Sequence, residues 1–443
     1  MNREEVEITG CGSEMQGVGR LSDGLAVFVP FAIPGERAEI EVLERRDRFA
    51  KARLIRVLRA SEDRVLPFCP YYQTCGGCQT QHIAYARALS LKRQKVYDAL
   101  VRVGGAENPK VLETIPSPGE RAYRNKAEFA FDDHGAGVYE GGTHRVIRID
   151  ACPLQSPLAN RALAYVQENR GRLPLRYLVT RVNEAGEMIA VLSLYAPVDA
   201  AAFARKMMSA LPFLKGVYSC RLSGRPAHAL DGACTLLCGE ERIRETLCGR
   251  TFSVSPKSFF QVNHAQTETL YAEALKLANL SPDDEIADVY CGAGAISLAA
   301  AGLCRRVTGI EIVPEAIRDA KENAEINELS EKTEFVCGDA ACVYPKLHRQ
   351  RHFSTVIVDP PRKGMDAPVV SALLQSPAER VIYVSCNPAT LARDVKALCA
   401  NQTYRLVSAQ PVDMFSQTEH VETVVLMSRA DASGRYPDGE RCQ

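Results

Sequence analysis

The sequence predicts a mixed α/β protein whose C-terminal part, residues 251–431, is a doubly wound parallel sheet. From residue 285 onward, short β-branched runs alternate with helical stretches, which is typical of repeated strand–helix–strand units. Two apolar segments, 404–412 and 421–427, are joined directly and predict a β-hairpin at one edge of this sheet. Residues 1–60 contain short strand-like runs between glycine turns, which indicates a separate OB-like β-barrel.

The composition indicates a large folded protein with no overall attraction to polyanions. Among 443 residues, 54 are Lys or Arg and 54 are Asp or Glu, and 46% are hydrophobic. Any surface that binds nucleic acid must therefore be local. Neither a signal peptide nor a run of about 18 apolar residues occurs, so we expect a cytoplasmic protein without membrane contact. We also expect a monomer.

We divide the chain into four parts. Residues 1–60 form the barrel, 61–250 a central α+β domain, 251–431 the doubly wound domain, and 432–443 a polar, flexible tail. The late strands of the barrel are rich in basic residues, which favours a surface that faces phosphates, with a solvated β-face as the alternative. These residues are Arg45, Arg46, Arg48, Lys51, Arg53, Arg56 and Arg59.

Cysteines cluster in the central part of the chain. Cys69, Cys75 and Cys78 lie within ten residues, with two glycines that allow the backbone to wrap around a ligand. Cys152, which also precedes a proline, is the best candidate for a fourth ligand. Four thiolates suit zinc or an iron–sulfur cluster, and their spacing does not choose between the two. The alternative is that these are buried free cysteines.

Two strands of the doubly wound domain end in reactive side chains. The apolar run 355–358 ends at Asp359, which begins Asp-Pro-Pro-Arg-Lys-Gly, and the run 381–384 ends at Ser-Cys386-Asn-Pro. Open α/β sheets bind their ligands outside the carboxyl ends of the strands. The sequence therefore predicts an acid and a thiol at one edge, where they are placed for chemistry.

A glycine turn earlier in this domain predicts a site for an adenosine cofactor. Gly292 and Gly294 follow the first strand, and Glu311, at the end of the second, is placed to bind a ribose diol. Asp339 follows the third strand and could reach the adenine edge. NAD is a rival cofactor, although Ser297 stands where the dinucleotide fingerprint has its third glycine.

With these motifs, nearly the whole chain resembles the RNA uracil-5-methyltransferases that use S-adenosyl-L-methionine. The matching segments are Phe-Phe-Gln-Val-Asn at 259–263, the Asp359 and Cys386 motifs, and His-Val-Glu-Thr at 420–423. The resemblance implies a TRAM domain, a Rossmann-like methyltransferase domain, and a 4Fe–4S cluster on Cys69, Cys75, Cys78 and Cys152. Ala295 departs from the pattern, because some members carry an asparagine there that contacts the cofactor.

The resemblance also implies roles for single residues. Cys386 is the nucleophile that adds to C6 of uracil, a role that suits a thiolate, and Glu422 is the base that removes the C5 proton. Gln261, Tyr290, Glu311 and Asp359 bind the cofactor, and Phe259, Gln261 and Asp359 lie near the target base. The uracil must be flipped out of folded RNA to reach the thiol.

Three other protein classes were weighed against this hypothesis. A nicotinamide-dependent oxidoreductase needs no cysteine at a strand end, and amino- or DNA-methyltransferases typically carry an aromatic residue where Arg362 follows the prolines. A non-catalytic RNA-binding protein would not need Cys386 and Glu422. For the RNA partner, the barrel and the cysteines favour 23S ribosomal RNA, with the T-loop uridine of transfer RNA as the alternative.

Overall fold

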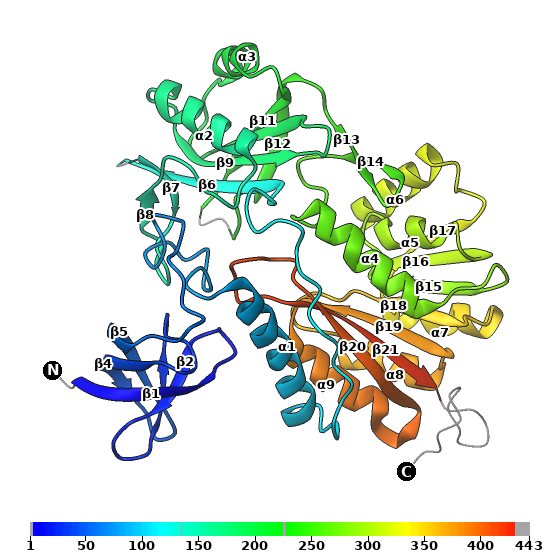
Figure 1. Ribbon diagram of the computed structural model, residues 1–443. Coiled ribbons are helices and arrows are strands. Elements are labelled where there is room, and N and C mark those ends of the chain that lie inside the picture. The colour runs from blue at the N-terminus through cyan, green and yellow to red at the C-terminus, as the bar shows by residue number, and fades with distance from the viewer. Residues whose placement is uncertain (1–2, 134, 225–226, 430–443) are drawn as a thin grey trace.

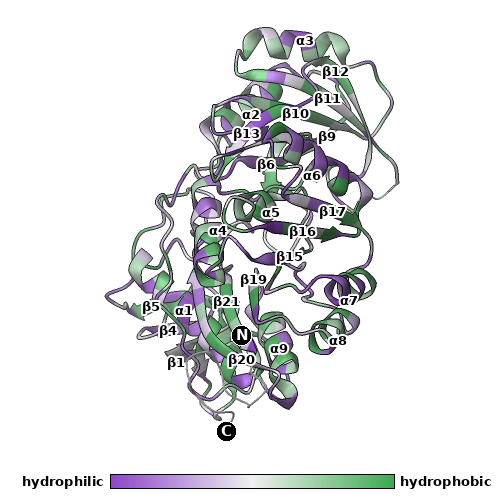
Figure 2. Cartoon of the chain, turned by 90° about the vertical axis from the view of Figure 1, so that its right-hand side faces the viewer, coloured by the Kyte–Doolittle hydropathy of each residue, from purple (hydrophilic) through white to green (hydrophobic). Residues whose placement is uncertain are grey.

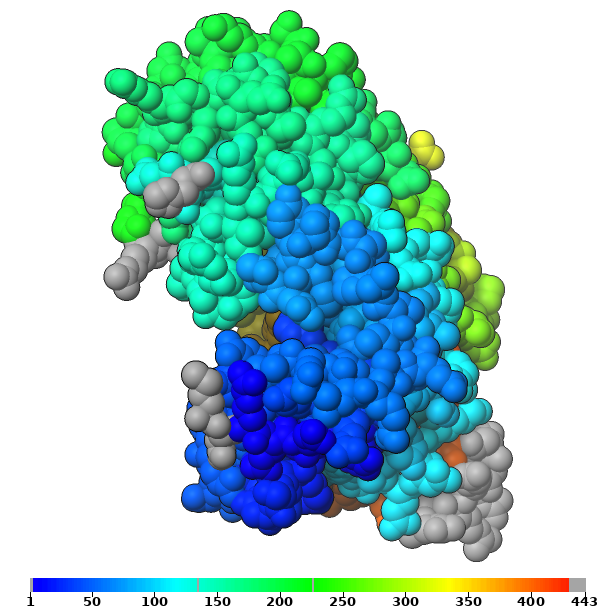
Figure 3. All heavy atoms as spheres, turned by 60° about the vertical axis from the view of Figure 1, so that its left-hand side comes forward, coloured from blue at the N-terminus to red at the C-terminus, as the bar shows by residue number. Residues whose placement is uncertain are grey.

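The computed structural model describes residues 3–133, 135–224 and 227–429, and the predicted tail 432–443 lies outside them. An N-terminal barrel, a central sheet and a C-terminal sheet follow one another along the chain (Figure 1). In the space-filling view, the blue segment that follows the barrel lies between the barrel and the central sheet (Figure 3). No helix in the described ranges is long and apolar enough to cross a membrane.

The N-terminal strands form the predicted closed barrel, in the order β1-β2-β3-β5-β4. Alternate side chains such as Val6, Ile8, Val27 and Ile40 are buried in its interior, as expected for strands with one solvent-facing side. The strands are β1 (Arg3–Cys11), β2 (Gly17–Arg20), β3 (Ala26–Val29), β4 (Arg37–Arg45) and β5 (Ala50–Arg59).

The prediction of a one-signed basic surface on this barrel is wrong. Strand register places Glu39 opposite Arg56 and Glu41 opposite Arg53, and both pairs form ion pairs. Further pairs join the basic residues to acidic ones, namely Arg37–Glu5, Arg45–Asp23, Arg46–Glu44, Lys51–Glu44 and Arg59–Glu7. The sequence places the cations on late strands, but pairing across strands brings carboxylates beside them.

The central sheet has seven strands, in the order β12-β11-β10-β9-β6-β7-β8. Helices α2 (Pro157–Asn169) and α3 (Ala201–Ala210) pack against it. A separate hairpin of β13 (Ile243–Leu247) and β14 (Arg250–Val254) crosses residue 250, where we predicted a domain boundary. The sheet strands are β6 (Lys126–Asp132), β7 (Gly135–Tyr139), β8 (Val146–Arg148), β9 (Leu175–Val182), β10 (Met188–Leu194), β11 (Leu214–Leu222) and β12 (Gly232–Gly239).

The C-terminal sheet has the predicted doubly wound form, in the order β17-β16-β15-β18-β19-β21-β20. Its first five strands are parallel, and β21 and β20 add the predicted antiparallel hairpin. The strands are β15 (Glu285–Val289), β16 (Arg306–Glu311), β17 (Thr333–Cys337), β18 (Thr355–Val358), β19 (Arg380–Ser385), β20 (Tyr404–Val412) and β21 (Glu422–Arg429). The helices are α4 (His264–Ala278), α5 (Ala295–Ala300), α6 (Pro314–Ile326), α7 (Ala340–Gln350), α8 (Ala367–Gln375), α9 (Pro388–Cys399) and the 3₁₀ turn η1 (Ala400–Gln402).

Both faces of this sheet are covered, so β18 and the middle of β19 are apolar on both sides. Figure 2 shows β19 as a hydrophobic strand inside the domain. Ile382 and Val384 belong to the hydrophobic cluster on one face, whereas Val381 and Tyr383 belong to the cluster on the other. Helix α1 (Tyr85–Arg102), which we expected in the central domain, packs against α9 and β20 of the C-terminal sheet instead. Its Val96 and Leu100 are fully buried there.

Candidate active site

A cleft of about 1650 Å³ lies at the carboxyl ends of the parallel strands. The structure brings together there every residue predicted to bind the cofactor or the base, or to act in catalysis. These are Phe259, Gln261, Tyr290, Glu311, Asp339, Asp359, Cys386 and Glu422. The common reason is that parallel strands present their carboxyl ends to the same edge of a sheet.

Cys386 and Glu422 face each other across two antiparallel strands. Ser385, the last residue of β19, pairs with Thr423 of β21. Cys386 directly follows β19, and Glu422 directly precedes Thr423 in β21. Continuation of the strand register therefore sets Cys386 and Glu422 opposite each other. The thiol is half-buried, and Glu422 is only 3% exposed. A nucleophile and a carboxylate thus share one wall of the cleft.

Three carboxyl groups line this cleft, and two of them, Asp288 and Glu422, are buried. Burial and the negative charge of Asp359 together raise the pKa of Glu422 to about 8. Burial and the charge of Asp288 raise the pKa of Asp359 to about 7. The pKa of Asp288 is raised to about 6 by burial, against a hydrogen bond donated by the Ser297 hydroxyl. This environment therefore favours protons on these groups, and a bound cation would favour their release.

The surroundings of Cys386 favour the neutral thiol over the thiolate. Burial raises the pKa of this thiol to about 11, and Glu422 adds to the effect. Arg362, in the Asp-Pro-Pro-Arg motif, acts in the opposite direction and lowers the pKa. The carbonyl of Arg362 accepts hydrogen bonds from Asn387 (3.2 Å) and Thr390 (3.2 Å), which fix the motif beside the Cys386 turn. Positive charge near Cys386 is therefore what would release its proton.

The glycine turn forms the other half of the cleft. Tyr290, Gly292 and Gly294 all have positive φ angles (69°, 53° and 83°), so the chain reverses tightly between β15 and α5. Glu311 accepts hydrogen bonds from the backbone N–H groups of Gly292 (3.3 Å) and Val313 (2.9 Å), which fix its carboxylate at the end of β16. Asp339 caps helix α7 through the N–H of Ala341 (2.8 Å).

Phe259 projects into the open part of the cleft. It is 76% exposed, whereas the neighbouring Phe260 is 9% exposed. The segment is held from both sides, because Asn125 donates to the carbonyl of Gln261 (3.1 Å) and Asn263 caps α4. An exposed aromatic ring on a fixed backbone offers a stacking surface for a flat ligand.

His420 and Phe415 also line the cleft, although the sequence analysis assigned them no role. Their rings meet edge to face at 5.9 Å, and Arg362 Nη2 lies 3.4 Å from His420 Nε2. Burial and nearby cations, Arg362 foremost, lower the pKa of His420 to about 4, so its imidazole is neutral near pH 7. The sequence signal that could have identified His420 is its position two residues before Glu422.

The four cysteines of the predicted metal site come from two segments. Cys75 forms a β-bridge with Glu140, and Asn160 holds Cys152 by exchanging hydrogen bonds with its backbone (2.9 and 3.0 Å). Burial raises the pKa of Cys78 to about 12, and the charges of Cys152, Cys75 and Cys69 act in the same direction. Within the described ranges, however, no three His, Cys, Asp or Glu side chains are arranged to hold a metal ion.

Family models match three parts of the chain. Residues 346–430 match the tRNA (uracil-5-)-methyltransferase model, residues 2–55 the TRAM domain, and residues 286–375 a methyltransferase domain. The first match spans the Asp359, Cys386 and Glu422 motifs, and the second covers the barrel.

Relatives match over nearly the full length. Proteins named "Uncharacterized RNA methyltransferase" from Caldanaerobacter subterraneus and Halalkalibacterium halodurans are 37% and 36% identical, covering 96% of this chain and 98% and 96% of their own. The solved Pyrococcus abyssi tRNA (uracil-54, C5)-methyltransferase, in complex with S-adenosyl-L-homocysteine, has a TM-score of 0.75 and 28% identity, over 96% of this chain and 100% of that one. The chain thus belongs to the TRAM-domain family of RNA uracil-5-methyltransferases, enzymes that use S-adenosyl-L-methionine.

Proposed function

We propose that this enzyme methylates C5 of a uracil in RNA through a covalent adduct with Cys386, and that 23S ribosomal RNA is its substrate. The observation that carries the mechanism is the opposition of Cys386 and Glu422 across β19 and β21, in the cleft that also holds Asp359. Uracil C5 is a poor nucleophile by itself. A reaction at this carbon needs a group that adds at C6 and a base for the C5 proton.

The thiolate of Cys386 attacks C6, and the electrons of the C5–C6 double bond move into an enolate. C5 then forms a bond to the methyl group, which S-adenosyl-L-methionine would supply; its sulfonium–methyl bond breaks, and S-adenosyl-L-homocysteine is the leaving group. Glu422 accepts the proton from C5, the double bond forms again, and the C6–S bond breaks to return the thiolate. Arg362 opposes the negative charge around Cys386, which helps the thiol to lose its proton.

The remaining cleft residues suit binding roles. The fixed carboxylate of Glu311 is placed for a ribose diol, and Asp339, Tyr290, Gln261 and Asp359 complete the cofactor site. Phe259 would stack on the flipped uracil, with Gln261 and Asp359 at its polar edge. The barrel and the central sheet would hold the surrounding RNA fold.

We also propose that Cys69, Cys75, Cys78 and Cys152 hold a 4Fe–4S cluster, rather than zinc. Four thiols from two segments, none of them in a disulfide, are the donor set that such a cluster would use. Iron and sulfide analysis of the purified protein, together with its visible absorption spectrum, tests this assignment.

Transfer RNA is the second candidate substrate, and one comparison favours it. The solved Pyrococcus abyssi enzyme, named for uracil 54 of tRNA, is covered over 100% of its chain. Because a tRNA enzyme shares the whole of this architecture, the architecture is compatible with either RNA substrate. The base that is modified must therefore be mapped.

The test is a map of 5-methyluridine in total RNA from cells with the gene, without it, and with the Cys386→Ala variant in its place. We expect one or more ribosomal sites to disappear without the gene and to stay absent with the variant. Loss confined to transfer RNA would keep the chemistry and overturn the ribosomal assignment. Normal methylation by Cys386→Ala would overturn the covalent mechanism.

A further inference from the structure

The loop between β20 and β21 leads directly into the proposed base. It runs from Asp413 to Val421, directly before Glu422, the first residue of β21. Phe415, His420 and Glu422 all line the cleft. The loop has no regular secondary structure of its own, so contacts with other parts of the chain must fix its shape.

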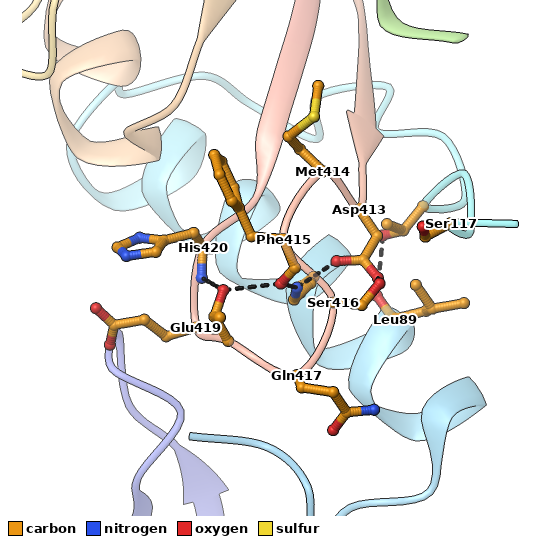
Figure 4. A network of polar contacts seen from close by, with 12 residues as sticks. Leu89, Ser117, Asp413, Met414, Phe415, Ser416, Gln417, Glu419 and His420 are labelled. Atoms are coloured by element: carbon orange, nitrogen blue, oxygen red, sulfur yellow. Dashed lines mark hydrogen bonds and ion pairs between the residues drawn. The ribbon is translucent and has the colours of Figure 1, made fainter. Parts of the chain in front are cut away.

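One set of contacts comes from helix α1. The Lys92 ammonium forms an ion pair with Asp413 in which the two side chains are 2% and 0% exposed, and it also donates to the carbonyl of Phe415 (3.1 Å). Tyr85 and Ser416 donate to the other Asp413 oxygen (both 2.7 Å). Figure 4 shows Asp413 and Ser416 on the side of the loop near Leu89 of α1, with Phe415 and His420 directed away from it.

A second set comes from the residues that directly follow Cys78. The backbone N–H groups of Gln79 and Thr80 both donate to the carbonyl of Gln417 (3.0 and 3.2 Å). The side-chain oxygen of Gln79 accepts from the N–H of Glu419 (3.3 Å). The side-chain nitrogen of the same Gln79 donates to the carbonyl of Gly76 (3.0 Å), between Cys75 and Cys78.

Gln79 therefore touches both the cysteine loop and the active-site loop. Its amide donates one hydrogen bond to the first loop and accepts one from the second, so moving the two loops apart would break at least one of these bonds. Gln417 is further held by its own side chain, which donates to Glu120 (2.6 Å). Glu419, which Gln79 fixes, lies three residues before Glu422 in the sequence and next to His420.

We propose that Gln79 is a positioning residue that fixes the loop that bears His420 and leads into Glu422 to the cysteine loop, so that the order of the cysteine loop sets the alignment of the base. The consequence for catalysis rests on the proposed function, whereas the link between the two loops rests on the hydrogen bonds alone. Proton removal from C5 is the step that a misplaced Glu422 would slow. Cofactor binding involves the opposite half of the cleft and is expected to be unaffected.

The test compares the full-length Gln79→Ala variant with wild type and with Gln94→Ala. Gln94 is an exposed residue of α1 whose side chain bonds only to Asp98 (2.8 Å), so its replacement removes a matched hydrogen bond away from the loop. Three quantities are measured: hydrogen exchange of the amides of residues 413–421, turnover with substrate RNA, and the fraction of protein linked covalently to unmodified RNA in the presence of S-adenosyl-L-methionine.

For Gln79→Ala we expect faster exchange in 413–421 and a fall in kcat of about fivefold, the scale of one or two hydrogen bonds. Because the adduct forms but loses its C5 proton slowly, the covalent fraction should rise while KM for the cofactor stays within about twofold. Gln94→Ala should match wild type in all three. Thermal unfolding of the variants establishes that the effect is local.

Unchanged exchange in Gln79→Ala would overturn the inference, and so would faster exchange without any change in turnover or adduct. A wild-type protein that methylates no RNA would overturn the proposed function instead. In that case the exchange measurement still decides whether Gln79 orders the loop, so the two failures are distinguishable.

Discussion

Glu422 is buried beside Cys386, and burial disfavours its ionised form. This property suits the proposed role of Glu422 as the base. A carboxyl group with a pKa of about 8 can accept a proton from carbon and hold it long enough for the thiolate to leave. The same burial makes Cys386 a poor thiolate in the empty cleft, with a pKa of about 11. Each group thus depends on charge brought by Arg362 and by the ligands.

At the residue scale, we expect Glu422→Gln to stop the reaction after methyl transfer. The amide cannot accept the C5 proton, so the methylated RNA should stay bound to Cys386. A denaturing gel should show a protein–RNA band that is absent for Cys386→Ala and for the double variant. The surface replacement Glu331→Gln serves as the control. A Glu422→Gln enzyme with full turnover would show that another group is the base.

The breakdown of this adduct should also depend on pH. Glu422 acts as a base only when ionised, and its pKa is about 8, so breakdown should accelerate from about pH 6 through pH 8 and level off above about pH 9. The spent cofactor carries no sulfonium charge, so it does not offset the effect of Asp359. The decay rate of preformed adduct after a pH jump measures this, and a flat profile over this range contradicts the assignment.

At the scale of elements, helix α1 supports a sheet that lies far from it in sequence. Its buried Val96 and Leu100 pack on the C-terminal sheet, and its Lys92 forms the fully buried ion pair with Asp413. A buried pair is weak support for stability as a whole, but removal of one partner leaves an uncompensated buried charge. This helix therefore couples the chain before the central sheet to the active-site loop.

Lys92→Met should consequently lower the free energy of unfolding by about 3–5 kcal/mol, since Asp413 loses its counter-ion. The exposed pair Lys276–Glu273 offers a matched control, and Lys276→Met should cost about 0–1 kcal/mol because solvent screens that pair. Urea unfolding at pH 7 measures both. Equal effects of the two replacements would mean that the Lys92–Asp413 pair does not order the loop.

At the scale of the whole molecule, the cleft contains three carboxyl groups whose ionisation lowers the stability of the fold. Asp288, Asp359 and Glu422 have pKa values of about 6, 7 and 8 in the folded chain, all above those of exposed carboxyl groups. At pH values between the unfolded-state and folded-state pKa values of these three groups, they bind more protons in the folded chain than in the unfolded one. Its stability is therefore greatest at low pH within this range, and it falls as pH rises.

Above about pH 7, where the histidines with lowered pKa values no longer titrate in either state, we expect the melting temperature of the ligand-free protein to fall up to about pH 9, and less steeply for Glu422→Gln, which lacks one of these protons. S-adenosyl-L-methionine, whose sulfonium is positive, should raise the melting temperature more at pH 8 than at pH 6. S-adenosyl-L-homocysteine lacks this charge and should show a smaller difference. Equal shifts for both cofactors at both pH values would contradict this account.

The sequence by itself determined the elements and the edge at which the chemistry takes place. Strands such as 355–358 and 381–385 are β-branched and end in polar turns, and parallel strands must end at one edge, so Asp359 and Cys386 could be brought together without coordinates. The OB-like barrel and the order of the C-terminal elements followed from the same local periodicity, whereas the TRAM assignment came from the family resemblance. Helices α2 and α7 were not predicted; α7 contains Pro345, which normally disfavours a helix interior.

Only the tertiary structure decided how charges and distant segments meet. Cross-strand register, which local pattern does not fix, neutralised the basic residues of the barrel with Glu39 and Glu41. Packing placed α1 on the C-terminal sheet and set Gln79 between two loops more than 300 residues apart in sequence. The pKa values of Cys386 and Glu422 likewise depend on burial and on neighbours through space, and these exist only once the chain has folded.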